Sequence, residues 1–311
     1  MTLLVRETSN TSQFEDLKNI KYVIGDIRDI VSIRKAADNV DLIYHLAAYV
    51  GIWAKNYSPY EEINVNGTEN VVKVTLEMNK KLIYMSSFTA IGPTPENSEE
   101  PVDESYENSD NLYMNYEKSK FAAKKLVKEY IEKGLKATLL YPAIVYGPGD
   151  FNIFGRMLFD VMRGKIFPLG VCPGKGDSIA TFTYVKDLAE IMANIAERDD
   201  IYGENFILGG ENIIFREYLD LIAEISRDKK VIKLPFWATV VYAWFLEVKA
   251  KFNKKVPYLT RPTLRAIKYH RAYSSKKAID KLGYKITPLR EGLQETIKWY
   301  QDYLENEKIK N

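Results

Sequence analysis

The chain has 311 residues, enough for one large domain or two smaller ones. Its 46% apolar and 28% charged residues support a folded core and exclude a disordered chain. Lys plus Arg number 44 and Asp plus Glu 42, so no basic excess predicts a nucleic-acid partner. One cysteine, Cys172, and two histidines, His45 and His270, exclude an internal disulfide and a Cys/His zinc site.

The N-terminus, Met-Thr-Leu-Leu-Val-Arg-Glu, lacks the basic start and apolar stretch of a signal peptide, so we expect a cytoplasmic protein. The longest uncharged apolar run, Leu234–Leu246, is shorter than the ~20 residues of a membrane span. Five aromatic residues in this run precede Lys249, Lys251, Lys254 and Lys255. Residues 234–255 therefore have two interpretations: a helix packed on the core, or a helix lying on a membrane surface.

Short apolar strands alternate with helical stretches up to about residue 210, which predicts an α/β fold with a parallel sheet covered on both faces. The predicted strands are Thr2–Arg6, Lys21–Ile24, Asp41–Leu46, Lys81–Ser86, Ala137–Tyr141 and Asn205–Leu208. The predicted helices are Val31–Asp38, Tyr60–Met78, Tyr113–Glu132, Ile153–Arg163 and Lys186–Glu197.

Beyond residue 210 the pattern becomes mostly helical and rich in lysine. We therefore predict two domains. Residues 1–150, together with 181–210, form the sheet domain. The smaller, mostly helical substrate-binding domain lies within 151–311 and consists mainly of 151–180 and 211–311.

Tyr116 and Lys120 are the first candidate catalytic pair. Residues four apart on a helix share a face, so the Lys120 ammonium can lie beside the Tyr116 phenol. A neighbouring cation lowers the pKa of a phenol from about 10, which predicts a tyrosine that exchanges protons near neutral pH.

The surroundings favour this pair over Tyr273 and Lys277, which have the same spacing. A predicted strand ends upstream at Ser87, and ligands of open α/β sheets bind at such carboxyl ends. Ser87 is thus placed to hydrogen-bond the substrate oxygen to which Tyr116 donates a proton, or from which it removes one. The alternative is that Ser87 is an ordinary turn residue and Lys120 a solvated helix lysine.

A series of short motifs occurs in a fixed order along nearly the whole chain. It consists of Gly25-Asp26-Ile27-Arg28-Asp29, His45-Leu46-Ala47-Ala48, Asn64-Val65-Asn66-Gly67-Thr68, Ser86-Ser87, Tyr116-x-x-Ser119-Lys120, Tyr146-Gly147-Pro148-Gly149-Asp150, Phe182–Ala189, Leu208–Asn212 and Leu282-Gly283-Tyr284. The series resembles the extended short-chain dehydrogenase/reductases. These include nucleotide-sugar epimerases and dehydratases, dihydroflavonol reductases and 3β-hydroxysteroid dehydrogenases.

The resemblance implies a Rossmann-like, doubly wound sheet and a role for each matched residue. It implies a catalytic triad of Ser87, Tyr116 and Lys120, with Lys120 also holding the nicotinamide ribose. The implied cofactor contacts are Arg6, Asp26, Ile27, Leu46, Ala47, Ala48, Asn64, Tyr116, Lys120, Pro142 and Ala143. The expected substrate contacts are Thr89 and Tyr146, and no metal ligand is implied.

Arg6 lies where NADP-preferring members keep an arginine for the 2′-phosphate, which favours NADP. Glu7 keeps NAD as the alternative. The resemblance also implies a homodimer formed through the helices at 60–78 and 113–132.

One element of the family is missing from the sequence. A dinucleotide-binding fold begins with a strand, a glycine-rich turn and a helix, but the first glycine here is Gly25. Thr2–Arg6 corresponds to the second strand of the fold. We therefore expect that Met1 is an internal position of a longer protein. We also expect the chain either to fold poorly or to pair strand two directly with strand four.

Two functional hypotheses follow. The first is an NAD(P)-dependent oxidoreductase or epimerase that acts on a carbonyl/hydroxyl pair of a small organic substrate, by hydride transfer with a tyrosine acid/base. The second is a catalytically silent binding protein, or an inactive truncated fragment, that no longer binds the dinucleotide. Retention of Ser87, Tyr116 and Lys120 favours the first, because nothing structural requires all three.

Overall fold

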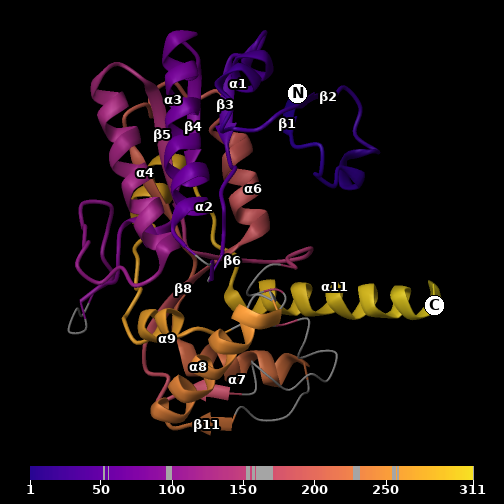
Figure 1. The fold of residues 1–311 in the computed structure, drawn as a ribbon, viewed down its shortest axis with the longest axis vertical. Coiled ribbons are helices and arrows are strands. Elements are labelled where there is room, and N and C mark those ends of the chain that lie inside the picture. Colours follow the sequence, from indigo (N-terminus) through magenta and orange to yellow (C-terminus); the bar gives the residue numbers. More distant parts are fainter. Residues whose placement is uncertain are drawn as a thin grey trace.

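The structure, a computed structural model, describes residues 1–51, 53–54, 56–95, 100–151, 155, 158, 171–226, 232–253, 257 and 259–310. Four parallel strands form its main sheet, in the order β3 (Leu42–His45), β4 (Lys81–Met85), β5 (Lys136–Pro142) and β9 (Asn205–Leu208). Figure 1 shows this sheet beside its long helices. The predicted parallel α/β architecture is confirmed.

Helices cover both faces of the main sheet. Successive side chains of a strand point to opposite faces. Accordingly, Leu82 and Leu139 pack in one apolar cluster, and Ile83 and Leu140 pack in another. The first cluster includes side chains from α1 (Ile30–Ala37), α3 (Thr68–Glu77) and α4 (Asn115–Glu132). The second includes side chains from α6 (Val185–Asn194) and α10 (Lys276–Leu282). Layers on both sides make the sheet doubly wound.

The predicted helix at 60–78 is built from three consecutive pieces: α2 (Ser58–Tyr60), the π-helical η2 (Glu61–Gly67) and α3. Gly67 allows close packing here, since a Cβ atom on it would lie 2.7 Å from Ile27 Cδ1. The helix predicted over 153–163 falls largely outside the described residues.

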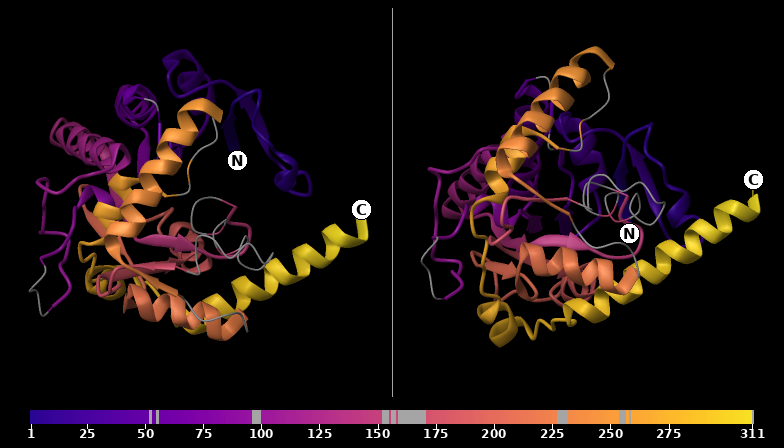
Figure 2. Two further views of the ribbon diagram at one scale, coloured as in Figure 1. Left: turned by 60° about the horizontal axis from the view of Figure 1, so that its bottom comes forward. Right: turned by 90° about the horizontal axis from the view of Figure 1, so that it is seen from below.

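A second group of elements lies below the main sheet in Figure 1. It has a three-stranded sheet in the order β10 (Asn212–Ile214), β8 (Ile179–Tyr184), β6 (Ile144–Tyr146), and a pair formed by β7 (Val171–Pro173) and β11 (Ile232–Leu234). Its helices are α7 (Phe215–Ser226), α8 (Phe236–Asn253), α9 (Arg261–Ile267) and α11 (Leu289–Lys310). Figure 2 shows the C-terminal end of α11 projecting from the molecule. In the described part of the chain, no helix combines the length and the apolarity needed to cross a bilayer.

The first two strands form a sheet of their own. β1 (Thr2–Val5) pairs in parallel with β2 (Lys21–Ile24), and among the described residues neither strand pairs with β3. The expected direct pairing of strand two of the fold with strand four, here β1 with β3, is therefore wrong. Helical contacts join the sheets instead, because Asn70 Nδ2 of α3 donates to the Ile27 carbonyl oxygen at 3.1 Å and Ile27 packs against Gly67.

Candidate active site

The three predicted catalytic residues come from the end of strand β4 and from helix α4, which packs against the main sheet. Ser87 directly follows the carboxyl end of β4, where the chain turns into the 3₁₀ helix η3 (Phe88–Ala90). Tyr116 and Lys120 lie one turn apart near the start of α4. All three line the same cavity, so the structure brings the predicted set together.

Ser87 is buried, and Thr89 determines which way its hydroxyl can act. The Thr89 backbone N–H donates to Ser87 Oγ at 3.2 Å, and Thr89 Oγ1 donates to the same atom at 3.0 Å. A hydroxyl group has two acceptor positions and one proton to donate. With both acceptor positions used by Thr89, the Ser87 proton is left to donate toward Tyr116 or a ligand in the cavity.

The predicted acidification of Tyr116 is contradicted. Burial raises the pKa of Tyr116 to about 12, and the Ser87 hydroxyl only partly offsets this rise. Lys120 does not contribute, because its Nζ donates to the Met85 carbonyl oxygen at 3.0 Å and lies 5.4 Å from the centre of the Tyr84 ring. The phenol therefore keeps its proton at neutral pH and is a proton donor in this state.

Lys120 is buried, and among the described residues no carboxylate pairs with its charge. Desolvation lowers the pKa of its ammonium to about 8. The nearby imidazole of His45 is neutral, since burial lowers its pKa to about 3 and the Lys120 charge adds to that effect. Lys120 therefore remains protonated at pH 7.

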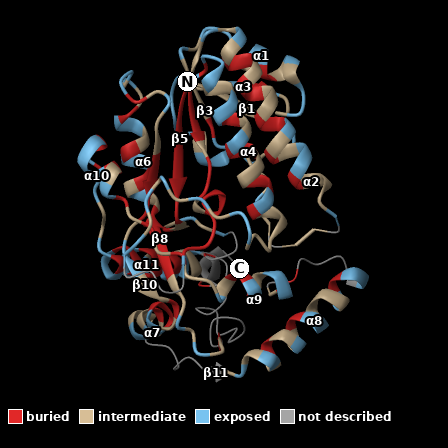
Figure 3. Cartoon of the chain, turned by 90° about the vertical axis from the view of Figure 1, so that its left-hand side faces the viewer, coloured by how far each residue is buried: buried red, intermediate tan, exposed pale blue. Residues whose placement is uncertain are grey.

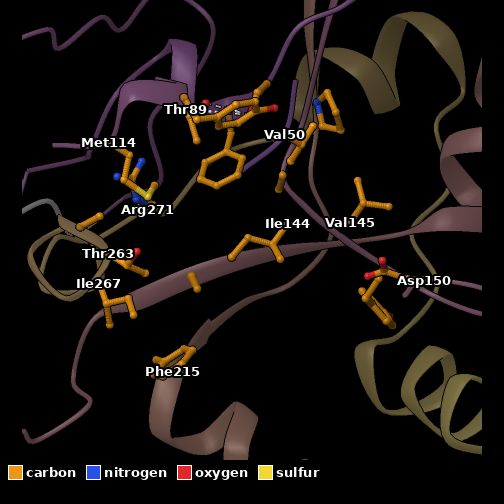
Figure 4. Close-up of a pocket in the computed structure, with 18 of the residues that line it drawn as sticks. Val50, Thr89, Met114, Ile144, Val145, Asp150, Phe215, Thr263, Ile267 and Arg271 are labelled. Carbon is orange, nitrogen blue, oxygen red and sulfur yellow. Dashed lines mark hydrogen bonds between the residues drawn. The ribbon is translucent and has the colours of Figure 1, made fainter. Parts of the chain in front are cut away.

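These groups open onto a cavity of about 760 Å³ that separates the main sheet from the second group of elements. In Figure 4, the lining residues Ile144 and Val145 lie between Thr89 and Arg271 on one side and Asp150 on the other. Its walls are mostly apolar and aromatic, and polar side chains gather beside Ser87. This composition is typical of a site that binds an apolar small molecule and orients it through a few polar contacts.

The cavity includes some of the predicted cofactor and substrate contacts and leaves others out. Besides the triad, its lining contains Leu46, Ala48, Thr89, Pro142, Ala143 and Tyr146. The lining does not contain Arg6, Asp26, Ile27, Ala47 or Asn64.

The predicted adenine-side residues interact with their own surroundings. Asp26 accepts two hydrogen bonds from the Arg28 guanidinium, at 3.0 and 2.8 Å, and these hold the pKa of its carboxyl below the usual value. Ile27 packs in the core beside Gly67. Arg6 follows β1 and is exposed to solvent.

Asn64 is buried and connects the loop after β3 to α4. Its Oδ1 accepts from the Tyr49 backbone N–H at 2.7 Å. Its Nδ2 donates to the Tyr49 carbonyl at 3.1 Å and to Ser119 Oγ at 2.9 Å. These bonds position the loop that contains Leu46 and Ala48 beside the cavity.

The residues present fit the nicotinamide half of a dinucleotide better than its pyrophosphate. Ser86 Oγ is buried and has no hydrogen-bond partner in the described structure, and Ser86 lines the cavity with Lys120, Pro142 and Ala143. A carboxamide and a ribose hydroxyl are suitable partners for such donors. For the pyrophosphate, the sequence has no glycine-rich turn ahead of Gly25.

The sequence analysis missed a buried ion pair beside Tyr116. The fully buried Glu117 accepts from Arg271 Nη2 through Oε1, while its Oε2 accepts from the backbone N–H groups of Tyr113 (2.9 Å) and Met114 (3.1 Å). Arg271 also lines the cavity, and its Nη1 is buried without a hydrogen bond in the described structure. No sequence signal links residues 154 positions apart.

The competing pair has a structural role. Tyr273 is buried and donates to the Gly92 carbonyl oxygen at 2.5 Å, and Lys277 donates to the Asn205 carbonyl oxygen at 2.8 Å. Neither residue lines the cavity.

The NAD dependent epimerase/dehydratase family model matches residues 2–209. Two isoforms of 3beta-hydroxysteroid-dehydrogenase/decarboxylase from Arabidopsis thaliana are each 27% identical over 299 residues. The matches cover 89% of this chain but only 66% and 51% of the isoforms. The chain thus spans about half to two thirds of the length of these relatives.

Solved structures show the same fold. The crystal structure of gox2253 is 31% identical, with a TM-score of 0.78 over 97% of this chain and 90% of that one. UDP-glucuronic acid 4-epimerase from Bacillus cereus, in complex with UDP-glucuronic acid and NAD, is 21% identical. Its TM-score is 0.72, and the match covers 94% of this chain and 84% of that chain.

Proposed function

The chain belongs to the NAD dependent epimerase/dehydratase family, and from that premise we propose that it interconverts a carbonyl and a hydroxyl group on a small organic substrate. The observation that supports this most strongly is the convergence of Ser87, Tyr116 and Lys120 on one apolar cavity. The bound dinucleotide would supply or accept the hydride. The residues of the chain orient the substrate oxygen and move its proton.

In the reducing direction, Tyr116 acts as the acid. Its pKa of about 12 keeps the phenol protonated, so a proton is available for the oxygen that becomes a hydroxyl. Ser87 donates a hydrogen bond to the same oxygen, because Thr89 uses its acceptor positions. Lys120, one turn further along α4 and on the same cavity, would hold the nicotinamide ribose.

The residues that would hold the nicotinamide end are Leu46, Ala48, Ser86, Lys120, Pro142 and Ala143. We propose that Arg6, Asp26 and Ile27 contact the adenosine end of the dinucleotide. Ala47 and Asn64 would contact the cofactor between its two ends. Arg6 is exposed after β1 and supports NADP as the preferred cofactor. Comparing kcat/KM for NADPH and NADH tests this preference: a higher value with NADH would reject it.

The substrate would lie between the two groups of elements, with residues 151–180 and 211–311 as the substrate-binding domain. Phe215, Leu219, Thr263 and Ile267 of this region line the cavity opposite the triad. Thr89 and Tyr146 line it as well and are the proposed substrate contacts. The mostly apolar wall supports a reductase or dehydrogenase of apolar substrates over a nucleotide-sugar epimerase.

We also propose a homodimer formed through the helices at 60–78 and 113–132. These helices pack against each other on one face of the sheet. Contact between this face and the same face of a second copy would bring the two α4 helices together. Light scattering during size-exclusion chromatography measures the mass directly. A monomer across the accessible concentration range would reject this part of the proposal.

Substitution of Tyr116 tests the catalytic proposal. With NADPH or NADH and a panel of apolar ketones, Tyr116→Phe should lower kcat by roughly 10²–10⁴-fold, since positioned proton transfer contributes about that much. Tyr273→Phe is the matched control, because it removes the hydroxyl of the other Tyr-x-x-x-Lys pair. Turnover by Tyr116→Phe equal to that of wild type would reject the assignment and indicate another catalytic residue, whereas no turnover by either protein would favour a silent binding protein.

A further inference from the structure

Helix α8 exposes large apolar side chains along one face. Trp237 is 70% exposed, Trp244 51%, Phe245 55% and Phe252 84%, and Val241 is exposed beside them. Their positions follow the i, i+4, i+7, i+8 and i+15 spacing of a single helix face. We call these five residues the aromatic face. Figure 3 shows α8 at the edge of the molecule, away from the main sheet.

The opposite face of α8 is packed. Thr239, Ala243 and Ala250 are buried, so the helix is fixed to the protein by its small residues and turns its largest ones outward. A helix packed only to complete a core would bury its aromatic side chains instead. Exposed apolar patches of this kind indicate a surface that binds a membrane or another molecule.

The sequence segment that contains the aromatic face carries a strong positive charge. Residues 236–268 contain seven Lys and Arg but a single acidic residue, Glu247. Arg261 already pairs with Glu247 at 2.8 Å. The whole chain has a formal charge of only +2, so the remainder is negative (37 Lys and Arg against 41 Asp and Glu). Along the sequence, cationic charge is thus concentrated in this one segment.

We propose that α8 lies on an anionic lipid surface, with its aromatic face in the headgroup region and its lysines against lipid phosphates. Tryptophan and phenylalanine on one face, with lysines beside them, form the chemistry of an interfacial helix. Lys249 and Lys251 are exposed at the C-terminal part of the helix, where they can reach anionic headgroups. The exposed aromatic residues need no insertion across the bilayer for this contact.

The same helix also forms part of the cavity wall. The proposed membrane-binding surface therefore lies next to the proposed active site. Thr239 and Tyr242 of α8 line the cavity, as does Leu234 just before the helix. This part of the inference rests on the proposed function: the substrate is an apolar alcohol or ketone that is dissolved in the bilayer and enters the cavity beside α8.

Vesicle sedimentation of the full chain tests the lipid contact without cofactor or substrate. We expect binding to vesicles of phosphatidylcholine and phosphatidylglycerol in equal parts to be at least about tenfold tighter than to phosphatidylcholine alone. Trp244→Ser/Phe245→Ser and, separately, Lys249→Glu/Lys251→Glu should each weaken it by at least about tenfold. The matched controls, Leu17→Ser/Val31→Ser and Lys276→Glu/Lys285→Glu, change exposed residues elsewhere and should bind as wild type does.

Three results would overturn the lipid contact: equal binding to both kinds of vesicle, binding unaffected by the aromatic substitutions, or a dimer that these substitutions dissociate.

Turnover of a long-chain ketone held in anionic vesicles tests the substrate route. The aromatic variant should raise KM for that ketone and leave KM for a water-soluble ketone unchanged, whereas an equal KM for both would refute the route. Loss of turnover with vesicle binding intact would instead count against the proposed function.

Discussion

At the scale of single residues, burial shifts the pKa values of the two ionisable groups of the proposed triad in opposite directions. The pKa of Tyr116 rises to about 12, and the pKa of Lys120 falls to about 8. Burial disfavours the charged form of each group, and this accounts for both directions. At pH 7 the site therefore holds a phenol and an ammonium, which is the protonation state that carbonyl reduction requires.

The high pKa of Tyr116 predicts different pH profiles for the two reaction directions. Alcohol oxidation needs the phenolate to accept a proton, so its kcat should rise between pH 7 and 10, by up to about tenfold per unit. Carbonyl reduction uses the phenol and should show no such rise. Initial rates measured in both directions over this range check the prediction. An oxidation rate that levels off near pH 7 would show that the ligand-bound site acidifies Tyr116.

The burial of Lys120 predicts a conflict between stability and activity. Lys120→Met removes a desolvated cation at similar volume, so at pH 7 the free energy of unfolding should increase by roughly 1 to 3 kcal/mol while turnover falls. Because the folded-state pKa is lowered, the unfolded chain binds more protons between about pH 8 and 10.5, and wild-type stability rises with pH there. The difference between variant and wild type should therefore shrink across that interval. Urea titrations at pH 7 and pH 10 measure it, and a destabilised variant at pH 7 would contradict the argument.

Sequence reasoning named Ser87, Tyr116 and Lys120, which line one cavity in the structure, but it did not predict their electrostatics. The i, i+4 spacing placed Tyr116 and Lys120 on one face of α4, and the strand end placed Ser87 nearby. Neither pattern reveals how much solvent reaches the groups or that Lys120 donates to the Met85 carbonyl. The sign of the pKa shift of Tyr116 was wrong for that reason.

At the scale of elements, the first turn of α4 is held by a contact from far along the chain. Glu117 joins the backbone N–H groups of Tyr113 and Met114 to Arg271. Tyr116 is the preceding residue in the same turn, so this ion pair makes its position depend on the segment before α10.

Removing the carboxylate should therefore affect both stability and turnover. Glu117→Gln leaves the buried Arg271 charge without its counter-ion, so the free energy of unfolding should fall by about 3 kcal/mol, with a lower kcat as Tyr116 shifts. Glu129→Gln, at an exposed position of the same helix, is the control. Urea denaturation and steady-state kinetics measure the two effects, and wild-type stability in Glu117→Gln would contradict the role assigned to the ion pair.

The longer elements could be predicted from sequence, and the short ones could not. Three of the four strands of the main sheet lie within predicted strands, and β5 extends one residue beyond each end of the predicted Ala137–Tyr141, because their apolar runs are bounded by turn residues. β6, β7, β10 and β11 have three residues each, too few to show a period. The segment 234–255 was left with two interpretations, because sequence gives the apolar residues of a helix but not which of them the fold buries.

At the scale of the whole molecule, the β1–β2 sheet and the main sheet are both parallel but do not pair with each other in the described structure. The side chains of β1 are half-buried, and Ile24 of β2 is 61% exposed. Most side chains of β4 and β5 are buried, because helices cover both faces of the main sheet. The sequence analysis located this discontinuity from the missing glycine turn but expected the strands to close it. The packing of Ile27 and Asn70 between α3 and the β1–β2 unit explains how the sheets are joined without that closure.

In the proposed reaction, hydride passes between a dinucleotide and a carbonyl carbon, and Tyr116 supplies the proton. Incubation with NADPH or NADH deuterated at the transferring position of the ring, followed by mass spectrometry of the alcohol product, measures the transfer directly. The account predicts an alcohol with one deuterium on its carbinol carbon in wild type, and at least about a hundredfold less of it in Tyr116→Phe. Cofactor oxidation without label in the product, or no labelled alcohol from any ketone of the panel, would contradict it.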